Sequence, residues 1–540
     1  MWTPSLSHAA RKPLAITSIS CQLLEQGPSS TRCDAGHRRR RRDTVGLRRV
    51  HRAGDPEVRP AWAAEQKRER KERRSAMREH GQQPTGVSRR QWLRVAGLAP
   101  AALMSAAACR PARRVVPEPE AKPVTLEYWH SWTMHWEDMT KFVAQAFHGR
   151  YPHITVNQVV VSPLMDKVLA AIAGASPPDV ATVYSAIHIP SLAEGGAALP
   201  MEEHATRDDV ARAKAWYHPM VWELGTYKGR VYGLSYWQQA ACLGWNKQVF
   251  VEANLDPNRP PRTIAELDEF AFRLTRFSQD GAIERMGFLP ASIWHWVPVF
   301  GGQFFDDRAG KITANHPNNL KALEWMVGYR QRLTPERIDV FMKRLTGAQD
   351  RGQQGEPFLN NQYAMVEVGG PWKLGDWKKF GPADFQYGIA PYPNPPGLSG
   401  TATWTYGDLS VVPQGAKHPR EAWRFVMFTG GVGGEDDYAK VLLWGGGHPI
   451  NVPVSTRMLG HPAVQQAIRD YPGFDTMIKL VFEGTRVGIP PKTPVGTLYQ
   501  QRLSAAVASA LRLEQPPKVA LDAVTDEVQK EHDQYFVQKK

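Results

Sequence analysis

The chain has 540 residues and a formal net charge of +14, which would ordinarily suggest a nucleic acid or an anionic membrane as partner. Residues 1–109 hold 22 of the 67 Lys and Arg and 9 of the 53 Asp and Glu, whereas residues 110–540 hold 45 and 44. The long C-terminal part is nearly neutral, so we expect no nucleic-acid partner. Of the four cysteines only Cys242 follows residue 109, which excludes an intrachain disulfide and a cysteine-based zinc site there.

Residues 1–76 are strongly basic, with an arginine run at 38–42 and a second cluster at 67–74. One interpretation is a basic arm for nucleic acid or lipid head groups. The alternative, which we favour, is a wrongly assigned start or a disordered extension, because Met77 begins a leader of ordinary length.

An export signal is predicted over residues 77–109. Arg89 and Arg90 are followed by a short apolar run at 95–104 and by small residues before Cys109. This arrangement is typical of a secretory signal and resembles a twin-arginine signal. An apolar run of about ten residues is too short for a membrane span, which needs about 20. Cys109 stands where a lipoprotein signal has its lipidated cysteine, and simple cleavage is the alternative.

Residues 110–122 are polar and contain prolines, which predicts a tether before the folded body. Strands are then predicted to alternate with helices, which indicates right-handed crossovers and a mainly parallel sheet. In this first part the predicted strands are 124–129, 154–161 and 179–184, and the predicted helices are 137–147 and 164–173.

Two extended segments over 231–246, broken around 237–240, predict the first passage to a second α/β unit. That unit has predicted helices after Thr263 and over 320–332, and predicted strands at 286–289, 364–368 and 387–393. The chain is extended again over 403–413, a helix starts at Pro419, and a mostly helical pattern begins at 435.

Ligands of open parallel sheets lie beyond the carboxyl ends of the strands, so the residues that follow each strand are the candidates for a binding site. Aromatic side chains recur there beside a few polar groups, which suits a sugar, because a sugar ring has apolar faces and a polar edge. Each aromatic side chain has a core role as its alternative. The candidates are His130, Trp132, Tyr184, Trp237, Trp294, Gly370, Trp372, Trp404 and Asp408.

The chain lacks Gly-x-Ser-x-Gly, Gly-x-x-x-x-Gly-Lys, His-Glu-x-x-His and any cluster with metal-ligand spacing. We therefore expect no enzyme, no cofactor and no metal site. Two alternatives to a sugar binder stay open: a binder of another solute, such as a glycerophosphodiester or a metal chelate, and a secreted carbohydrate-active enzyme.

Several motifs resemble the bacterial ABC-transporter extracytoplasmic solute-binding proteins related to maltose-binding protein. They are Ala-Ala-Ile-Ala-Gly-Ala-Ser-Pro-Pro-Asp-Val at 170–180, Leu-Ala-Glu-Gly-Gly at 192–196, Gly-Leu-Ser-Tyr at 233–236, Gly-Trp-Asn-Lys at 244–247, Gly-Pro-Trp at 370–372, Tyr-Gly-Ile-Ala-Pro at 387–391 and Gly-Asp-Leu-Ser-Val-Val-Pro at 407–413. The resemblance implies a two-lobe periplasmic-binding-protein fold of class α/β, each lobe a mainly parallel sheet flanked by helices, with the ligand cleft between the lobes. It also implies that Trp372 stacks on a sugar, that Tyr184 lines the first lobe and that Tyr499 is a late aromatic contact.

The predicted function is a monomeric extracytoplasmic protein, held to the membrane by a lipid anchor, that closes on a di- or oligosaccharide and delivers it to an ABC permease. The twin-arginine machinery would export it. The predicted organisation is lobe 1 at 123–238, lobe 2 at 239–402, a return to lobe 1 at 403–455 and a mostly helical part, largely lobe 2, at 456–540.

Overall fold

The computed structural model describes residues 122–133, 135–349, 356–443, 448–449 and 451–538. The predicted export signal, with Arg89, Arg90 and Cys109, lies outside these residues, as do residues 1–76 and nearly all of the tether. Across the described part of the chain, no helix combines the length and the apolar character that a bilayer crossing requires.

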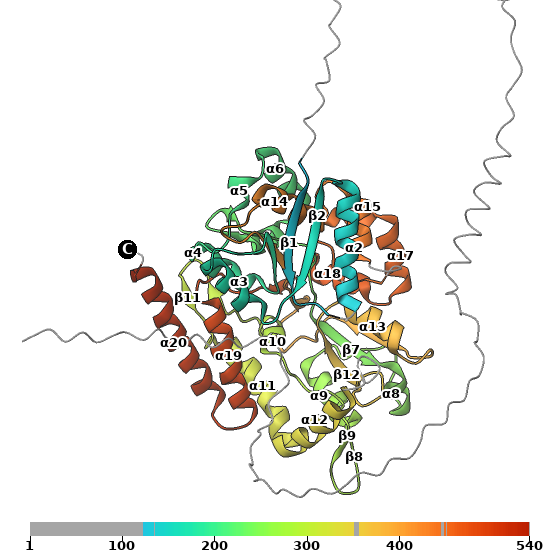
Figure 1. Cartoon of the computed structure of the whole chain (residues 1–540). Helices are drawn as coiled ribbons and strands as arrows, with labels where there is room; N and C mark the ends of the chain where they lie inside the picture. Colours follow the sequence, from blue (N-terminus) through green and yellow to red (C-terminus); the bar gives the residue numbers. More distant parts are fainter. Residues whose placement is uncertain (1–121, 134, 350–355, 444–447, 450, 539–540) are drawn as a thin grey trace, which may run out of the picture. The chain divides into compact units, whose positions relative to one another are not determined.

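The first sheet has five strands in the order β2-β1-β3-β15-β6 (Figure 1). Strand β1 is parallel to both β2 and β3, whereas β15 is antiparallel to both β3 and β6. The parallel core follows from the right-handed crossovers through two helices, α2 and α3. The strands are β1 (Val124–His130), β2 (Ile154–Val160), β3 (Val180–Val183), β6 (Gly233–Ser235) and β15 (Leu409–Val411), and the helices are α2 (His135–Arg150) and α3 (Leu164–Ala173).

The second sheet has three strands, β7 (Cys242–Asn246), β12 (Met365–Val368) and β13 (Tyr387–Ala390), in the order β12-β7-β13. Strand β7 is antiparallel to both neighbours. The two-lobe α/β prediction is confirmed, but the prediction that each sheet is mainly parallel is wrong for this one. Its central strand comes directly from the first sheet and enters in the opposite direction to its neighbours.

Three segments of the chain run side by side between the two halves of the fold. The segment between β6 and β7 donates backbone hydrogen bonds from Gln239 to Tyr406 (2.8 Å) and from Ala241 to Trp404 (3.1 Å). Strand β14 (Ala402–Trp404), on the return passage, pairs in parallel with β16 (Arg486–Gly488). The third passage contains β16 and leads from α18 (Phe474–Glu483) to α19 (Gly496–Leu511). All three passages lie beside one another and form one connecting region, where a hinge between the lobes is expected.

The remaining elements flank the sheets or form short hairpins. The helices are α4 (Ile189–Glu194), α5 (Met201–His204), α6 (Arg207–Trp216), α7 (Pro219–Leu224), α8 (Lys247–Glu252), α9 (Ile264–Leu274), α10 (Ile293–Val299), α11 (Pro317–Leu333), α12 (Pro335–Gln349), α13 (Trp372–Phe380), α14 (Pro419–Thr429), α15 (Glu435–Leu442), α17 (Pro462–Asp470), α18 (Phe474–Glu483), α19 (Gly496–Leu511) and α20 (Pro517–Gln538), with 3-10 turns η1 (Ala186–His188) and η3 (Thr456–Gly460). The short strands are β4 (Thr226–Tyr227), β5 (Arg230–Val231), β8 (Arg276–Phe277), β9 (Ile283–Arg285), β10 (Phe305–Asp306) and β11 (Lys311–Ile312).

The buried hydrophobic residues form three clusters. The second sheet lies between the first two, and the third packs α3 and α4 against the first sheet. Alternate side chains of β7 point to opposite faces, so Cys242 packs in the first cluster while Leu243 and Trp245 pack in the second. The first cluster runs from the helices of the first sheet to α13, α17 and α18. The second cluster joins α9, α10 and α11 to α19 and α20, and Figure 1 shows these last two side by side.

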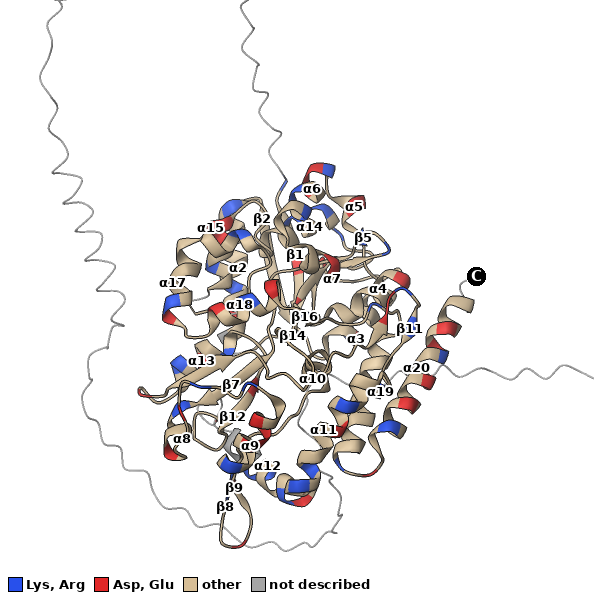
Figure 2. Cartoon of the chain, turned by 180° about the vertical axis from the view of Figure 1, so that it is seen from behind, with Lys and Arg blue, Asp and Glu red and all other residues tan. Residues whose placement is uncertain are grey.

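Local sequence patterns predicted most of these elements. Helix α9 begins after Thr263, whose hydroxyl accepts a hydrogen bond from the backbone of Glu266 (3.1 Å), and α14 begins at Pro419. The predicted strand at 286–289 is wrong, because Met286 forms only an isolated bridge to Tyr363. Figure 2 shows acidic and basic residues interspersed along the described elements, in keeping with the nearly neutral charge of this part.

Candidate functional site

The ends of β1 and β3 carry a polar pair that joins two loops of the first sheet. Both the backbone N–H and the hydroxyl of Ser131 lie 2.7 Å from the Tyr184 hydroxyl. Tyr184 is half-buried, and burial raises the pKa of its phenol, so the hydroxyl stays protonated near neutral pH. The two loops that follow neighbouring parallel strands are thus held in a fixed arrangement.

Trp132 lies at the centre of an aromatic group at these strand ends. Its ring centroid is 5.5 Å from that of Tyr184, 5.9 Å from that of Tyr236 and 5.8 Å from that of Trp237. Trp237 is only 2% exposed, whereas Trp132 is half-buried. These ring contacts fix the position of Trp132, and because Trp132 is half-buried, part of its indole stays accessible.

Asp408 lies beneath this group, on the return passage between the sheets. Its carboxylate accepts a hydrogen bond from the Trp237 indole (2.7 Å). Burial raises the pKa of Asp408 to about 7, and the hydrogen bond from Trp237 opposes that shift only in part. The carboxyl group of Asp408 therefore titrates near neutral pH.

His130 supports Trp132 from the interior. It is fully buried, its Nε2 lies 3.3 Å from the Thr140 hydroxyl, and its ring centroid is 5.6 Å from that of Trp132. Burial lowers the pKa of His130, so its imidazole is neutral. Its position suits a residue that orients Trp132 better than one that meets a ligand.

Trp372 and Gly370 follow β12 at the edge of the second sheet. A Cβ atom at Gly370 would lie 2.8 Å from the Asn451 Oδ1 and 3.1 Å from the Trp372 Cδ1, so a larger residue would displace the Asn451 amide and press on the Trp372 ring. Trp372 is half-buried, and its ring centroid is 6.5 Å from that of Trp136, which lies in α2 of the first sheet. Trp136 was not among the predicted site residues, because this residue lies in a helix and not directly after a strand.

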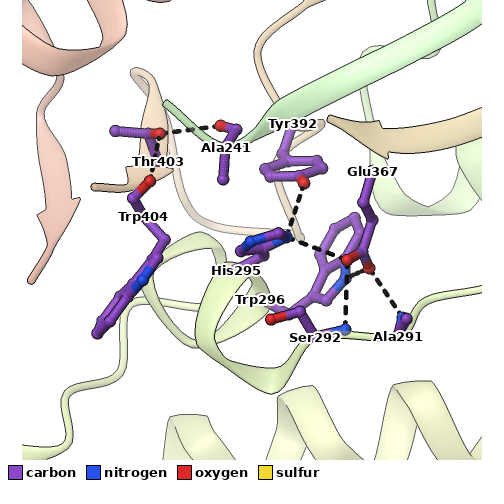
Figure 3. Close-up of polar contacts among 9 residues, drawn as sticks. All are labelled: Ala241, Ala291, Ser292, His295, Trp296, Glu367, Tyr392, Thr403 and Trp404. Carbon is purple, nitrogen blue, oxygen red and sulfur yellow. Dashed lines mark hydrogen bonds and ion pairs between the residues drawn. The ribbon is translucent and has the colours of Figure 1, made fainter. Parts of the chain in front are cut away.

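A carboxylate on β12 fixes the start of α10 (Figure 3). Glu367 accepts hydrogen bonds from the backbone N–H groups of Ala291 (2.9 Å) and Ser292 (3.2 Å) and from the Trp296 indole (2.6 Å). The Nδ1 of His295 lies 3.0 Å from the same carboxylate, and only the nitrogen can donate when the carboxylate is ionised. Sequence reasoning missed Glu367 and His295, because no motif marks them.

Trp294 lies in the turn that Glu367 fixes. Its ring centroid is 5.1 Å from that of Trp404 and 4.2 Å from that of Phe304. Trp294 is half-buried, whereas Trp404 is 6% exposed and belongs to a hinge strand. Tyr499 lies behind this pair, fully buried, and its hydroxyl donates to the Phe304 carbonyl (2.8 Å).

The structure thus divides the predicted site residues into three groups. The first holds His130, Trp132, Tyr184, Trp237 and Asp408, the second Trp294, Trp404 and Tyr499, and the third Gly370 and Trp372. Trp132 and Tyr184 are half-buried in the first group, Trp294 in the second and Trp372 in the third, and the remaining members are buried. Among the described residues, no group of His, Cys, Asp and Glu is arranged to hold a metal ion.

Two α/β lobes joined by three adjacent passages, with half-buried aromatic rings at the strand ends of both, define the two-lobe class of extracytoplasmic solute-binding proteins. A family model described as "Bacterial extracellular solute-binding protein" matches residues 137–432, more than half of the chain. The chain belongs to this family.

Relatives and solved structures agree with that assignment. A maltotriose-binding protein of Pyrococcus abyssi is 23% identical over 412 residues, which is 75% of this chain and 80% of the relative. A solved structure titled "CpMnBP1 with Mannotriose Bound" is similar with a TM-score of 0.65 and 26% identity, over 75% of this chain and 100% of that one. The ABC substrate-binding protein from Listeria monocytogenes in complex with cycloalternan has the same fold, with a TM-score of 0.62, 17% identity and coverage of 76% and 99%.

Proposed function

We propose that the chain is the solute-binding component of an ABC importer, and that it closes on a di- or oligosaccharide and passes it to the permease. One observation carries the proposal: partly accessible indoles, Trp132 and Trp372, follow strands of two different sheets. A sugar between two lobes could stack its apolar faces on such rings while its hydroxyls meet polar groups at their edges.

The proposed ligand contacts are four half-buried aromatic residues, together with the carboxyl group of Asp408, which is buried and accepts a hydrogen bond from the Trp237 indole. They are Trp132, Tyr184, Trp294, Trp372 and Asp408. The other candidates, His130, Trp237, Gly370, Trp404 and Tyr499, are buried and would support those contacts from behind. The relatives favour a sugar, because the ligands in their names are maltotriose and mannotriose.

A phosphate-bearing solute is the second candidate. A relative named the sn-glycerol-3-phosphate-binding protein of Brucella abortus is 26% identical, over 28% of this chain and 35% of its own length. Phosphate recognition asks for available cationic donors. Lys373 is the basic residue beside Trp372, and its ammonium is 2.9 Å from Glu356, so its charge is already balanced. This pairing favours a neutral ligand.

A carbohydrate-active enzyme is a weaker alternative. Hydrolysis of a glycosidic bond usually needs two carboxyl groups on opposite sides of the bond. In the group around Trp132, Asp408 is the carboxyl group that the described contacts place beside the rings. The family to which the chain belongs consists of binding proteins.

A thermal-shift screen of the purified protein tests the proposed function. Mannotriose, maltotriose and sn-glycerol-3-phosphate are suitable probes. A ligand at 100 times its dissociation constant should add about 2.7 kcal/mol to the free energy of unfolding. A shift with a trisaccharide and none with the phosphate would support the sugar binder, whereas the reverse result would replace it by the second candidate.

Trp372→Ala is expected to weaken sugar binding about thirtyfold, because truncation of an aromatic anchor typically costs about 2 kcal/mol or more. The melting temperature without ligand should change little, because Trp372 is half-buried. Calorimetric titration beside thermal unfolding separates the two effects. A large loss of unliganded stability with unchanged affinity would show that Trp372 is a packing residue.

We further propose how the protein reaches the outside of the cytoplasm. This proposal rests on the sequence before residue 122. Arg89 and Arg90 would direct export through the twin-arginine machinery, and Cys109 would carry the lipid that anchors the protein outside the cytoplasm. Residues 110–122 would then tether a monomeric body with lobes at 123–238 and 239–402 and a return at 403–455. The packing of α19 and α20 in the second cluster supports the assignment of this helix pair, within 456–540, to the second lobe.

Changing both Arg89 and Arg90 to Lys should leave the precursor inside the cell, because the arginine pair is what the transport receptor reads. Cell fractionation with an immunoblot measures the effect. The matched control is the change of Arg113 and Arg114 to Lys, which alters a pair of the same composition that follows Cys109. Normal export of the Arg89/Arg90 variant would contradict the twin-arginine interpretation.

A further inference from the structure

Trp136 and Trp372 are contacting indoles from segments that follow different sheets. Trp136 lies in the first turn of α2, six residues after β1 ends, and Trp372 begins α13, four residues after β12 ends. Their ring centroids are 6.5 Å apart and their planes are at 81°. This is an edge-to-face contact, so neither ring covers the face of the other over its whole area.

Two neighbouring side chains, Lys373 and Glu356, help to hold the Trp372 ring in place. The Lys373 ammonium lies over it, 4.7 Å from the ring centroid, and pairs with Glu356 at 2.9 Å. Glu356 also accepts a hydrogen bond from the Trp377 indole (3.2 Å), and its side chain is only 15% exposed. The cation is therefore held in place, and one face of the Trp372 ring is occupied by it.

Trp372 is half-buried, so part of its indole stays accessible beside the Lys373 ammonium and the Trp136 ring. Trp136 is half-buried, so part of its own indole is accessible as well. The segment between β1 and α2 also carries Trp132, whose ring is held by Tyr184 and Trp237 within the first sheet. Trp132 and Trp136, four residues apart, therefore differ in their surroundings: Trp132 is held among first-sheet residues, whereas Trp136 contacts Trp372.

We propose that Trp136 is a second stacking residue of the ligand site, and that a saccharide ring of the ligand lies between the indoles of Trp136 and Trp372. This inference rests on the proposed sugar-binding function. An edge-to-face pair leaves no space for a sugar ring, so the two indoles must separate when the ligand enters. Binding thus replaces a ring-to-ring contact by two ring-to-sugar contacts.

The test uses the full-length protein with mannotriose and maltotriose as probes. Trp136→Ala should weaken binding of the trisaccharide about thirtyfold, comparable with truncation of other aromatic anchors. The matched control is Trp129→Ala, which removes a half-buried indole of β1 whose Nε1 bonds to Glu127. The control should change the affinity less than about twofold. The double variant with Trp372→Ala should lose less affinity than the product of the single losses, because both rings contact the same sugar ring.

A spectroscopic measurement gives a readout that a structural role would not move. Two contacting indoles give a coupled signal in circular dichroism, and the difference between the spectra of the wild type and Trp136→Phe isolates it. Trisaccharide binding should abolish that signal. An affinity of Trp136→Ala equal to that of Trp129→Ala, or a coupled signal that persists in the complex, would overturn this inference while leaving the sugar-binding function intact. Absence of binding by the wild-type protein would overturn both.

Discussion

Asp408→Asn is expected to raise the free energy of unfolding at about pH 8.5 and to leave it nearly unchanged at about pH 4. Burial raises the pKa of this carboxyl group from 3.8 to about 7 in the folded protein. Below the unfolded pKa both states are protonated, so the group has no effect on stability. Between the pKa of the unfolded state and that of the folded state, only the folded protein keeps the proton on Asp408, so the free energy of unfolding falls as the pH rises.

Above about pH 7 the ionised Asp408 lowers the free energy of unfolding by its full amount. A pKa difference of about three between the folded and unfolded states corresponds to at most about 4 kcal/mol. Asparagine removes the charge and keeps an oxygen that accepts the hydrogen bond of the Trp237 indole. Urea unfolding of both proteins at several pH values measures the difference. The gain should appear progressively as the pH is raised through about 7.

Asp179→Asn is the matched control. Asp179 is also buried, but its carboxylate accepts hydrogen bonds from the backbone N–H groups of Glu127 (3.0 Å) and His418 (2.9 Å). An amide group cannot accept at both positions, so this variant should be less stable than the wild type at neutral pH. If Asp408→Asn lost stability in the same way at pH 8.5, the carboxylate of Asp408 would be a stabilising group and the argument from burial would be wrong.

Tyr499→Ala is expected to lower the free energy of unfolding by about 3–5 kcal/mol, as truncation of large buried aromatic side chains does. Tyr499 is fully buried in the second cluster, and its ring centroid is 6.4 Å from that of Phe304 and 6.5 Å from that of Trp294. Removal of the side chain leaves a cavity behind the ring of Trp294. Thermal or urea unfolding without ligand measures the loss.

Tyr499→Phe separates the hydroxyl from the ring. It removes only the hydrogen bond to the Phe304 carbonyl, so the loss should be about 1 kcal/mol. If Tyr499 were instead a direct ligand contact, Tyr499→Ala would weaken sugar binding and leave unliganded stability within about 1 kcal/mol of the wild type. That result would restore the ligand-contact role that the family resemblance implies.

Hydrophobic periodicity predicted the local elements well where each element is long and amphipathic. Helix α3 has the predicted bounds, and β1 and β2 differ from their predictions by one residue. The direction of β7 was beyond such reasoning, because a strand pattern is the same for parallel and antiparallel neighbours. The strand prediction for the short apolar run at 286–289 was wrong for a related reason. Only the tertiary surroundings of this run decide whether it pairs over several residues.

The candidate site was predictable in part. The rule that ligands lie beyond strand ends selected Trp132, Tyr184 and Trp372, which the structure leaves half-buried. The same rule selected Trp237 and His130, which are buried, because a position after a strand does not reveal the direction of the side chain. Trp136 was missed, since its contact with another sheet depends on how the two lobes meet.

The order of the chain also has a consequence for biosynthesis. The second cluster begins with Ala241 and two residues of β7, yet it is complete only when Leu503, Ala520 and Val524 pack into it. During translation the first sheet likewise lacks β15 until residue 411 has been made. Neither half of the protein can finish folding on the ribosome as an independent N-terminal unit, because each waits for a strand or a helix encoded far downstream. The nascent chain must therefore remain incompletely packed through most of its synthesis, and chaperones have a long interval in which to bind it.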